Sequence, residues 1–353
     1  MKILVTGVNN GSAKRNYYKS HRNRSKLITP ATGLVMALEG MGHDVDQRYV
    51  TPGEDLSGYD KVFSFNTFRR EGQWSGLYGV LWVQATRKDA IICIDDWAVA
   101  KPAYKLHTSD HEDLDHLLFR DWVHTAAPQE HKDALTPEVR EKLKSVVSSK
   151  SLFDDFTFLY CAFNKFDVSK ILDVPHKAYF YNPDSVVPTP LERLGFQLVK
   201  PERKKSWAII GLAGTPLNKI TKDVTEFKCP IVYHGPSSKC GTFKEDIVSE
   251  PEVLATYQRT TMVYYSDQGN FGSNWWRNRP RQCADLGAVL YIPSDEEAKL
   301  FGESYRHLSI ELLESMSVEE LAELAAKQKK DLYESNPIDK EMVYHSLEQV
   351  LNL

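Results

Sequence analysis

Continuous apolar runs alternate along the chain with segments that have a single apolar face. Residues 2–8, KILVTGV, are apolar almost throughout, as is typical of a strand that is buried on both faces of a parallel sheet. Residues 31–41 instead carry their apolar side chains at helical spacing, at Leu34, Val35 and Leu38. Strands that alternate with helices in this way predict an α/β fold.

The same alternation continues to the end of the chain and predicts its remaining elements. We expect strands at residues 44–50, 61–66, 90–94, 156–163, 177–181, 206–210, 231–234, 261–265 and 288–292. We expect helices at residues 76–87, 110–121, 137–149, 216–227, 251–258, 318–333 and 338–351. In the helix at 318–333 the apolar positions are 318, 321, 322, 325 and 332.

A proline-rich segment separates two halves that repeat this pattern. Its prolines are Pro183, Pro188, Pro190 and Pro201. Such composition is typical of an interdomain linker. We therefore predict two Rossmann-like domains that face a cleft, at residues 1–182 and 206–335. Residues 183–205 would link them, and a C-terminal helix within 336–353 would return to the first domain.

Composition narrows the class of protein. The chain has 353 residues, of which 26% are charged and 42% hydrophobic, which is ordinary for a globular protein. The net charge of -4 argues against a wholly basic nucleic-acid-binding protein but permits a local basic patch. The five cysteines are scattered and form no CxxC motif, which argues against structural zinc. With neither a signal peptide nor a long apolar run, the sequence predicts a soluble cytoplasmic protein.

The strand at residues 261–265 and the stretch at 267–293 together read as one parallel βαβ unit with a basic cluster in its loop. Three arginines, Arg277, Arg279 and Arg281, stand beside the predicted start of a helix. Free amides, the helix dipole and guanidinium groups all favour a phosphate there, at the sheet edge where α/β folds bind ligands. The alternative is a solvated, purely structural helix face.

A long basic loop follows the first strand. The chain reads GVNNGSAKRN where a dinucleotide fingerprint would need GxGxxG, which argues against an NAD-dependent oxidoreductase. The loop contains cations and two tyrosines: Lys14, Arg15, Tyr17, Tyr18, Lys19, Arg22, Arg24 and Lys26. This composition suits the binding of a polyanion, although it fits a solvated loop without a ligand equally well. A second predicted edge loop carries Arg69, Arg70 and Trp74.

Two carboxylates, Asp95 and Asp96, follow the apolar strand at residues 90–94. Carboxylates at the carboxyl end of a buried strand are well placed for general-base catalysis, and the alternatives are a helix cap or a partner for an arginine. The histidine-rich stretch at 107–131 matches no standard metal-ligand spacing, so we expect no metal site there.

Two Rossmann-like halves, a proline-rich linker, a glycine turn at residues 211–215 and the arginine-rich helix before GAVLYIP together resemble a GT-B glycosyltransferase. The opening MKILVTGVNN, the strand that runs into Asp95 and the module at 267–293 are similar to the phage β-glucosyltransferases that modify hydroxymethylcytosine in DNA. The resemblance is concentrated in these segments.

The resemblance implies a role for particular residues. Asp95 would be the catalytic base, with Asp96 as its competitor. The UDP-sugar would be held by Gly211, Ala213, Gly214, Thr215, Lys219, His234, Gly235, Arg277, Arg279 and Gln282. The family has a glutamate on the ribose where this chain has Gln282, so the donor stays open between UDP-glucose and a pentose donor such as UDP-arabinose.

The implied reaction is an inverting transfer to hydroxymethylcytosine or hydroxymethyluracil in double-stranded DNA. DNA would be gripped by Lys14, Arg15, Lys19, Arg22, Arg24, Arg69, Arg70 and Trp74. No metal is obligatory, although Mg²⁺ could activate, and we expect a monomer in the cytoplasm of the phage host. Two alternatives remain: a GT-B enzyme that acts on a glycan or small molecule, and a non-catalytic nucleotide- or DNA-binding protein.

Overall fold

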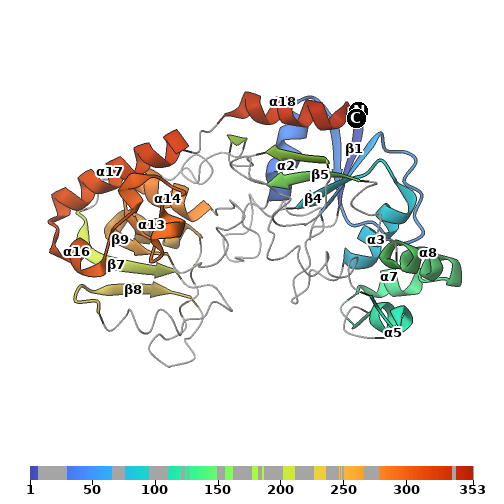
Figure 1. The fold of residues 1–353 in the computed structure, drawn as a ribbon, viewed down its shortest axis with the longest axis horizontal. Helices are drawn as coiled ribbons and strands as arrows, with labels where there is room; N and C mark the ends of the chain where they lie inside the picture. The colour runs from blue at the N-terminus through green and yellow to red at the C-terminus, as the bar shows by residue number, and fades with distance from the viewer. Residues whose placement is uncertain are drawn as a thin grey trace. The chain divides into compact units, whose positions relative to one another are not determined.

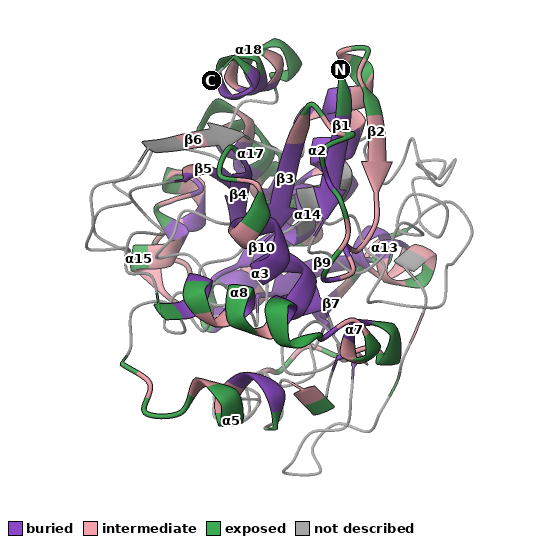
Figure 2. Cartoon of the chain, turned by 90° about the vertical axis from the view of Figure 1, so that its right-hand side faces the viewer, coloured by how far each residue is buried: buried purple, intermediate pink, exposed green. Residues whose placement is uncertain are grey.

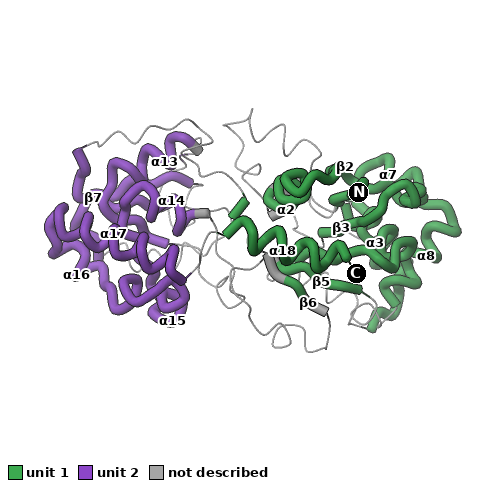
Figure 3. Tube along the Cα trace, turned by 90° about the horizontal axis from the view of Figure 1, so that it is seen from above, with its two compact units in different colours: residues 1–18, 28–187, 339–353 green, residues 19–27, 188–338 purple. Residues whose placement is uncertain are grey.

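The structure of the chain is a computed structural model. The described residues are 1–6, 30–65, 76–94, 110–120, 124–125, 127–148, 156–161, 177–181, 185–186, 202–210, 226–235, 246, 248, 250–265, 278–335 and 339–352. The chain divides into two compact units (Figure 3). Unit 1 comprises Met1–Tyr18, Ile28–Val187 and Asp339–Leu353, and unit 2 comprises Lys19–Leu27 and Pro188–Ile338.

Unit 1 is built on a six-stranded sheet (Figure 1), and Figure 2 labels its strands, which follow the order β2-β1-β3-β4-β5-β6 with every pair of neighbours parallel. Its strands are β1 (Lys2–Thr6), β2 (Asp44–Gln47), β3 (Lys61–Phe65), β4 (Ile91–Ile94), β5 (Thr157–Cys161) and β6 (Lys177–Tyr181). β3 and β4 are buried almost throughout, which explains their uninterrupted apolar sequences.

One face of this sheet packs against α3 (Leu77–Thr86) and α8 (Pro137–Ser148), and Leu4, Val62 and Ile92 contribute to the shared core. Figure 2 shows α3 buried along its length, while α8 exposes its outer side. α3 can lie this deep because it approaches the backbone closely at Gly79, where an added Cβ would clash with the carbonyl oxygen of Val50. The short helices α5 (Leu114–Phe119) and α7 (Gln129–Asp133) lie, like α8, in the connection between β4 and β5.

The C-terminal helix belongs to unit 1. α18 (Lys340–Leu351) contacts β6 and α2 (Pro30–Gly40). The Asp339 side chain caps α18 by accepting from the Met342 N–H at 3.1 Å, and the Asp339 N–H donates to the Ser185 hydroxyl at 3.1 Å. The buried positions of α2 include Leu34, Val35 and Leu38, as its apolar spacing predicts.

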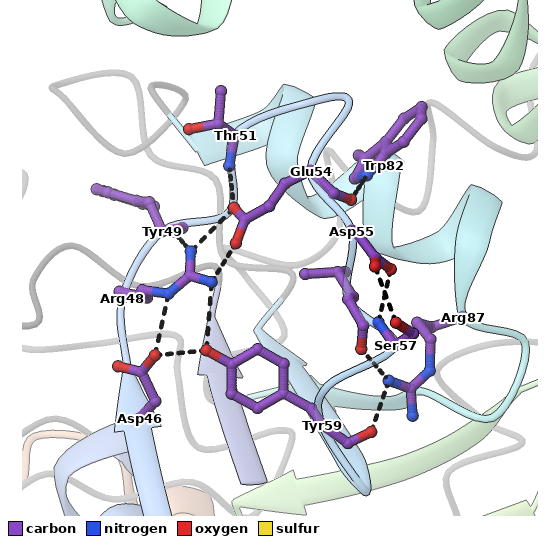
Figure 4. A network of polar contacts seen from close by, with 11 residues as sticks. Asp46, Arg48, Tyr49, Thr51, Glu54, Asp55, Ser57, Tyr59, Trp82 and Arg87 are labelled. Carbon is purple, nitrogen blue, oxygen red and sulfur yellow. Dashed lines mark hydrogen bonds and ion pairs between the residues drawn. The ribbon is translucent and has the colours of Figure 1, made fainter. Parts of the chain in front are cut away.

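A polar network organises the irregular segment between β2 and β3 (Figure 4). The Arg48 guanidinium donates to Asp46 at 3.0 Å, to Glu54 and to the Tyr59 hydroxyl at 3.2 Å. The Tyr59 hydroxyl donates in turn to Asp46 at 2.6 Å. Farther along the segment, Arg87 donates to the backbone carbonyls of Leu56 and Tyr59. These contacts hold an irregular segment whose sequence carries no periodic signal.

Unit 2 has a four-stranded parallel sheet in the order β10-β9-β7-β8. Its strands are β7 (Lys204–Ile210), β8 (Ile231–His234), β9 (Thr260–Tyr264) and β10 (Val289–Tyr291). Its described residues form the helices α13 (Glu250–Arg259), α14 (Asn278–Leu286), α15 (Asp295–Ala298), α16 (Ile310–Ser315) and α17 (Val318–Ser335), with a 3-10 turn at Glu303–Tyr305. Trp207, Tyr264 and Tyr291 form an aromatic layer of the core together with residues of α16 and α17.

The edge strand β10 is completed by a side chain of α17. The Gln328 side chain accepts from the Leu290 N–H at 2.8 Å and donates to the Leu290 carbonyl at 3.0 Å. This amide supplies the two hydrogen bonds that a further strand would otherwise provide. Gln328 is 1% exposed, whereas Ala322, which we expected on the buried face, is exposed.

The predicted α/β class is confirmed, and so is the parallel βαβ unit formed by β9, α14 and β10. The sequence missed α7, α15 and α16, which are short helices of 5, 4 and 6 residues. Elements so short hold too few residues to show a helical period. β7 begins at Lys204, two residues inside the segment that we predicted as linker.

Candidate functional site

The order of strands in unit 2 places its topological switch point between β7 and β9. From β7 the chain moves outward to β8 and then returns to form β9 on the other side of β7. Ligands of open α/β sheets bind outside the carboxyl ends of the strands at such a point. β7 ends at Ile210, directly before the predicted glycine turn, and β9 leads toward α14. The residues Gly211, Ala213, Gly214, Thr215, Lys219 and Arg277 themselves lie outside the described residues.

The start of α14 is cationic and buried. Arg279 is 9% exposed and Gln282 is 7% exposed. The two residues are three positions apart and so share one face of the helix. The first turn of α14 contains arginines and no acidic residue that would neutralise them. The helix dipole disfavours cations at this end of a helix and favours anions. An anion bound at this helix start would therefore be stabilised both by the dipole and by Arg279.

Arg279 lies over an aromatic ring at the end of β9. Its guanidinium carbon is 5.5 Å from the centre of the Tyr265 ring, within range of a cation–π interaction. Cys283, one turn farther along α14, is buried, and burial raises the pKa of its thiol to about 12 against the opposing charge of Arg279. An aromatic ring and a neutral thiol therefore lie near Arg279.

Arg281, which we expected beside the other two arginines, has a different partner from Arg279. Its side chain is 3.9 Å from the Asp285 carboxylate, which also accepts from the Tyr333 hydroxyl at 2.8 Å and lies 3.3 Å from the Lys329 amine. Tyr333 and Lys329 belong to α17. This cluster joins α14 to α17 and gives Arg281 a structural role.

Sequence reasoning missed Arg203, which holds the other end of α14. Its guanidinium donates to the carbonyl oxygens of Leu286 and Gly287, the last of α14 and its glycine cap, and to that of Thr260 at 3.3 Å. Gly287 has a φ of 70°, a left-handed conformation that favours glycine at the end of a helix. A lone arginine in a segment read as linker gave no periodic or motif signal.

His234 and Gly235 stand at the carboxyl end of β8. The His234 Nδ1 is 2.7 Å from the Asp246 carboxylate, and its Nε2 is 2.8 Å from the Thr256 hydroxyl. Gly235 exchanges both backbone hydrogen bonds with Asp246 at 2.8 Å. A contact between His234 and a ligand would have to replace one of these bonds or use the face of the ring.

In unit 1 the switch point lies between β1 and β3, with β4 as the next neighbour. These strands end at Thr6, Phe65 and Ile94. Neighbouring strands lie about 4.8 Å apart, and Asp95 directly follows Ile94 in the sequence. The predicted catalytic and DNA-binding segments thus leave from three adjacent strand ends. Their residues lie outside the described part of the chain: Lys14, Arg15, Lys19, Arg22, Arg24, Arg69, Arg70, Trp74, Asp95 and Asp96.

The described residues provide neither a metal-ligand cluster nor a membrane-spanning helix. Among them, no group of three or more histidine, cysteine or acidic side chains is arranged to hold a metal ion. None of the helices in this part of the chain combines the length and the apolar character that crossing a membrane requires.

Comparisons with known proteins agree with the geometry of the fold. No protein-family model matches the chain, and no curated protein sequence matches it significantly. Among solved structures, a mutant of T4 phage β-glucosyltransferase in complex with UDP-glucose matches with a TM-score of 0.58 at 13% identity. Each chain is covered completely. The chain has the GT-B fold of T4 phage β-glucosyltransferase.

Two further structures support this assignment of the fold. One is a β-glucosyltransferase described as a DNA-modifying enzyme, solved with and without its substrate uridine diphosphoglucose, and the other is again T4 phage β-glucosyltransferase. Both match at 11% identity with a TM-score of 0.53 over the full length of both chains. The resemblance seen in the sequence is thus confirmed for the fold, and the role of each residue has to be argued from the site.

Proposed function

We propose that this protein is a glycosyltransferase that moves a sugar from a UDP-sugar to the hydroxyl of hydroxymethylated pyrimidines in DNA. The observation that carries the proposal is the cationic start of α14 at the switch point of unit 2. A buried arginine and a helix dipole favour a diphosphate there. The shared fold with an enzyme solved in complex with UDP-glucose supports a uridine nucleotide as the donor.

The acceptor is argued from unit 1. The basic loop, the Arg69–Arg70 pair and Asp95 follow strand ends that are neighbours in one sheet, which suits a polyanion held beside a general base. One of the β-glucosyltransferases that share this fold is a DNA-modifying enzyme, and this supports DNA as the polyanion. A hydroxymethyl base within a duplex has to leave the stack before it can reach Asp95, at a cost of a few kcal/mol.

The proposed reaction is a single displacement. The hydroxymethyl oxygen attacks the anomeric carbon as Asp95 takes its proton, and the bond from that carbon to UDP breaks. UDP leaves with the bonding electrons, and Arg279 with Lys219 stabilises the charge that develops on it. One displacement inverts the anomeric configuration. Because these cations neutralise the leaving group, the proposal includes no obligatory metal.

The sugar remains open within the proposal. Gln282 shares a helix face with Arg279 and can hydrogen bond the hydroxyls of a ribose, but it carries no charge. Both UDP-glucose and a pentose donor such as UDP-arabinose fit an uncharged amide. We keep the monomeric state as a prediction.

UDP release in the presence of DNA tests the proposal. Duplexes that contain hydroxymethylcytosine, hydroxymethyluracil or unmodified cytosine would be compared with each UDP-sugar in turn. We expect release only with a hydroxymethylated duplex. Asp95→Ala should abolish release while UDP still binds, and Asp96→Ala should retain it. The opposite result for the two variants would make Asp96 the base, and release that depends on a glycan rather than on DNA would contradict the proposed acceptor.

A further inference from the structure

Tyr265 occupies a distinct position at the carboxyl end of β9. Successive residues of a strand point to opposite faces of the sheet. Tyr264 packs into the aromatic layer with Trp207 and Tyr291, so Tyr265 faces the opposite side, toward α14. Its backbone N–H donates to the Tyr291 carbonyl at 2.9 Å, which fixes it to the end of β10. Tyr265 is 1% exposed.

The ring of Tyr265 forms a rigid support for Arg279. The guanidinium lies 5.5 Å from the centre of this ring, and Arg279 is only 9% exposed. A guanidinium that is attracted to an aromatic face is restricted in its orientation. The backbone of Arg279 is fixed as well, because α14 is held to α17 through Asp285 and capped by Arg203.

We propose that Tyr265 is a positioning residue for the nucleotide diphosphate. Its ring holds the Arg279 guanidinium in the orientation that binds phosphate before the ligand arrives. Without the ring, the long arginine side chain would have to be ordered on binding, which weakens affinity. This inference rests on the proposed function, because it assumes that Arg279 binds the diphosphate of the donor.

Comparing UDP with uridine separates positioning from general support of the fold. Uridine has the base and ribose of UDP but no phosphate, so its binding does not depend on Arg279. In calorimetric titrations of the full-length protein, Tyr265→Leu should weaken UDP binding about threefold to tenfold. Uridine binding should stay within about twofold of wild type. Tyr265→Phe keeps the ring and should restore UDP binding.

Tyr264→Leu is the matched control. Tyr264 is equally buried and adjacent in sequence, but it faces the aromatic layer instead of Arg279. Loss of its ring lowers stability without touching the guanidinium. Any effect of Tyr264→Leu should therefore be the same for UDP and for uridine. If Tyr265→Leu does not fold, Tyr265→Met fills a similar volume and takes its place.

A double-mutant cycle completes the test. In the background of Arg279→Ala, Tyr265→Leu should cause no further loss of UDP affinity, because the group that it positions is absent. The inference is overturned if Tyr265→Leu weakens UDP and uridine equally, or if its effect persists without Arg279. In either case the proposed function stands. If wild-type protein binds neither UDP nor uridine, the proposed function and this inference are both wrong.

Discussion

Removing the Arg203 guanidinium should loosen the end of α14 and destabilise unit 2. The side chain donates to the carbonyl oxygens of Leu286, Gly287 and Thr260. Leu286 and Thr260 are each 2% exposed, so water cannot readily replace the guanidinium at those two oxygens. Arg203→Met is the informative change, because it keeps the aliphatic stem and removes only the donors.

The expected magnitude follows from the number of acceptors that are left without a donor. A hydrogen bond from a charged group contributes about 1.5–3 kcal/mol, and a buried acceptor left unsatisfied costs about 1–3 kcal/mol. With two buried acceptors, and a third that water can reach at Gly287, we expect a loss of about 2–4 kcal/mol in the free energy of unfolding of unit 2.

Native-state hydrogen exchange measures this loss within one unit. Amides of α14 and β9 should exchange with an opening free energy lower by that amount, while amides of β3 in unit 1 should not change. Arg203→Lys restores a charge and a single donor group and should recover part of the loss. A loss below about 0.5 kcal/mol in Arg203→Met would show that these hydrogen bonds do not hold α14.

Gly79, His131 and the basic loop each give a further prediction. Gly79→Ala should destabilise unit 1 by about 1–3 kcal/mol in chemical denaturation, because the new Cβ meets the Val50 carbonyl; Gly58→Ala, which meets nothing within 4 Å, should not. Burial lowers the pKa of His131 below its unfolded value of about 6.5, so the unfolded chain takes up the proton first and stability falls as the pH drops below that value. His131→Phe should flatten the decline between about pH 7 and 5, and an unchanged slope would assign the decline to other groups. Neutralising three cations of the basic loop should flatten the salt dependence of DNA affinity, and an unchanged slope would remove that loop from the DNA site. The three are Lys14, Arg15 and Lys19.

The sequence predicted the regular elements well, because a strand that is buried on both faces has an uninterrupted run of apolar residues. β6 and β8 have the bounds expected from residues 177–181 and 231–234. A polar side chain that hydrogen bonds to the backbone in place of another strand shows no such pattern in the sequence. Gln328 sits at a helical spacing from Leu321 and Ala325, but an amide does not read as a core residue. Its role becomes visible only once β10 is known to be an edge strand.

The candidate site, like the fold, could be predicted from the sequence only in part. Arg279 could be identified from a cluster of arginines before a glycine and a strand, because βαβ units place their turns in a regular order. The cluster alone puts Arg279 and Arg281 together at the start of one helix, and the resemblance to the phage β-glucosyltransferases selected Arg279 for the donor. The structure adds their partners: Tyr265 for the first and Asp285 for the second. The switch points likewise depend on strand order, which no local pattern encodes.

The attachment of a sugar to DNA can be tested by identifying the product itself. DNA that contains hydroxymethylcytosine or hydroxymethyluracil would be incubated with the protein and a panel of UDP-sugars, digested to nucleosides and analysed by mass spectrometry. We predict a modified nucleoside heavier by one hexose or one pentose residue, absent with Asp95→Ala. Unmodified nucleosides in every reaction, from protein that binds UDP tightly, would contradict DNA as the acceptor.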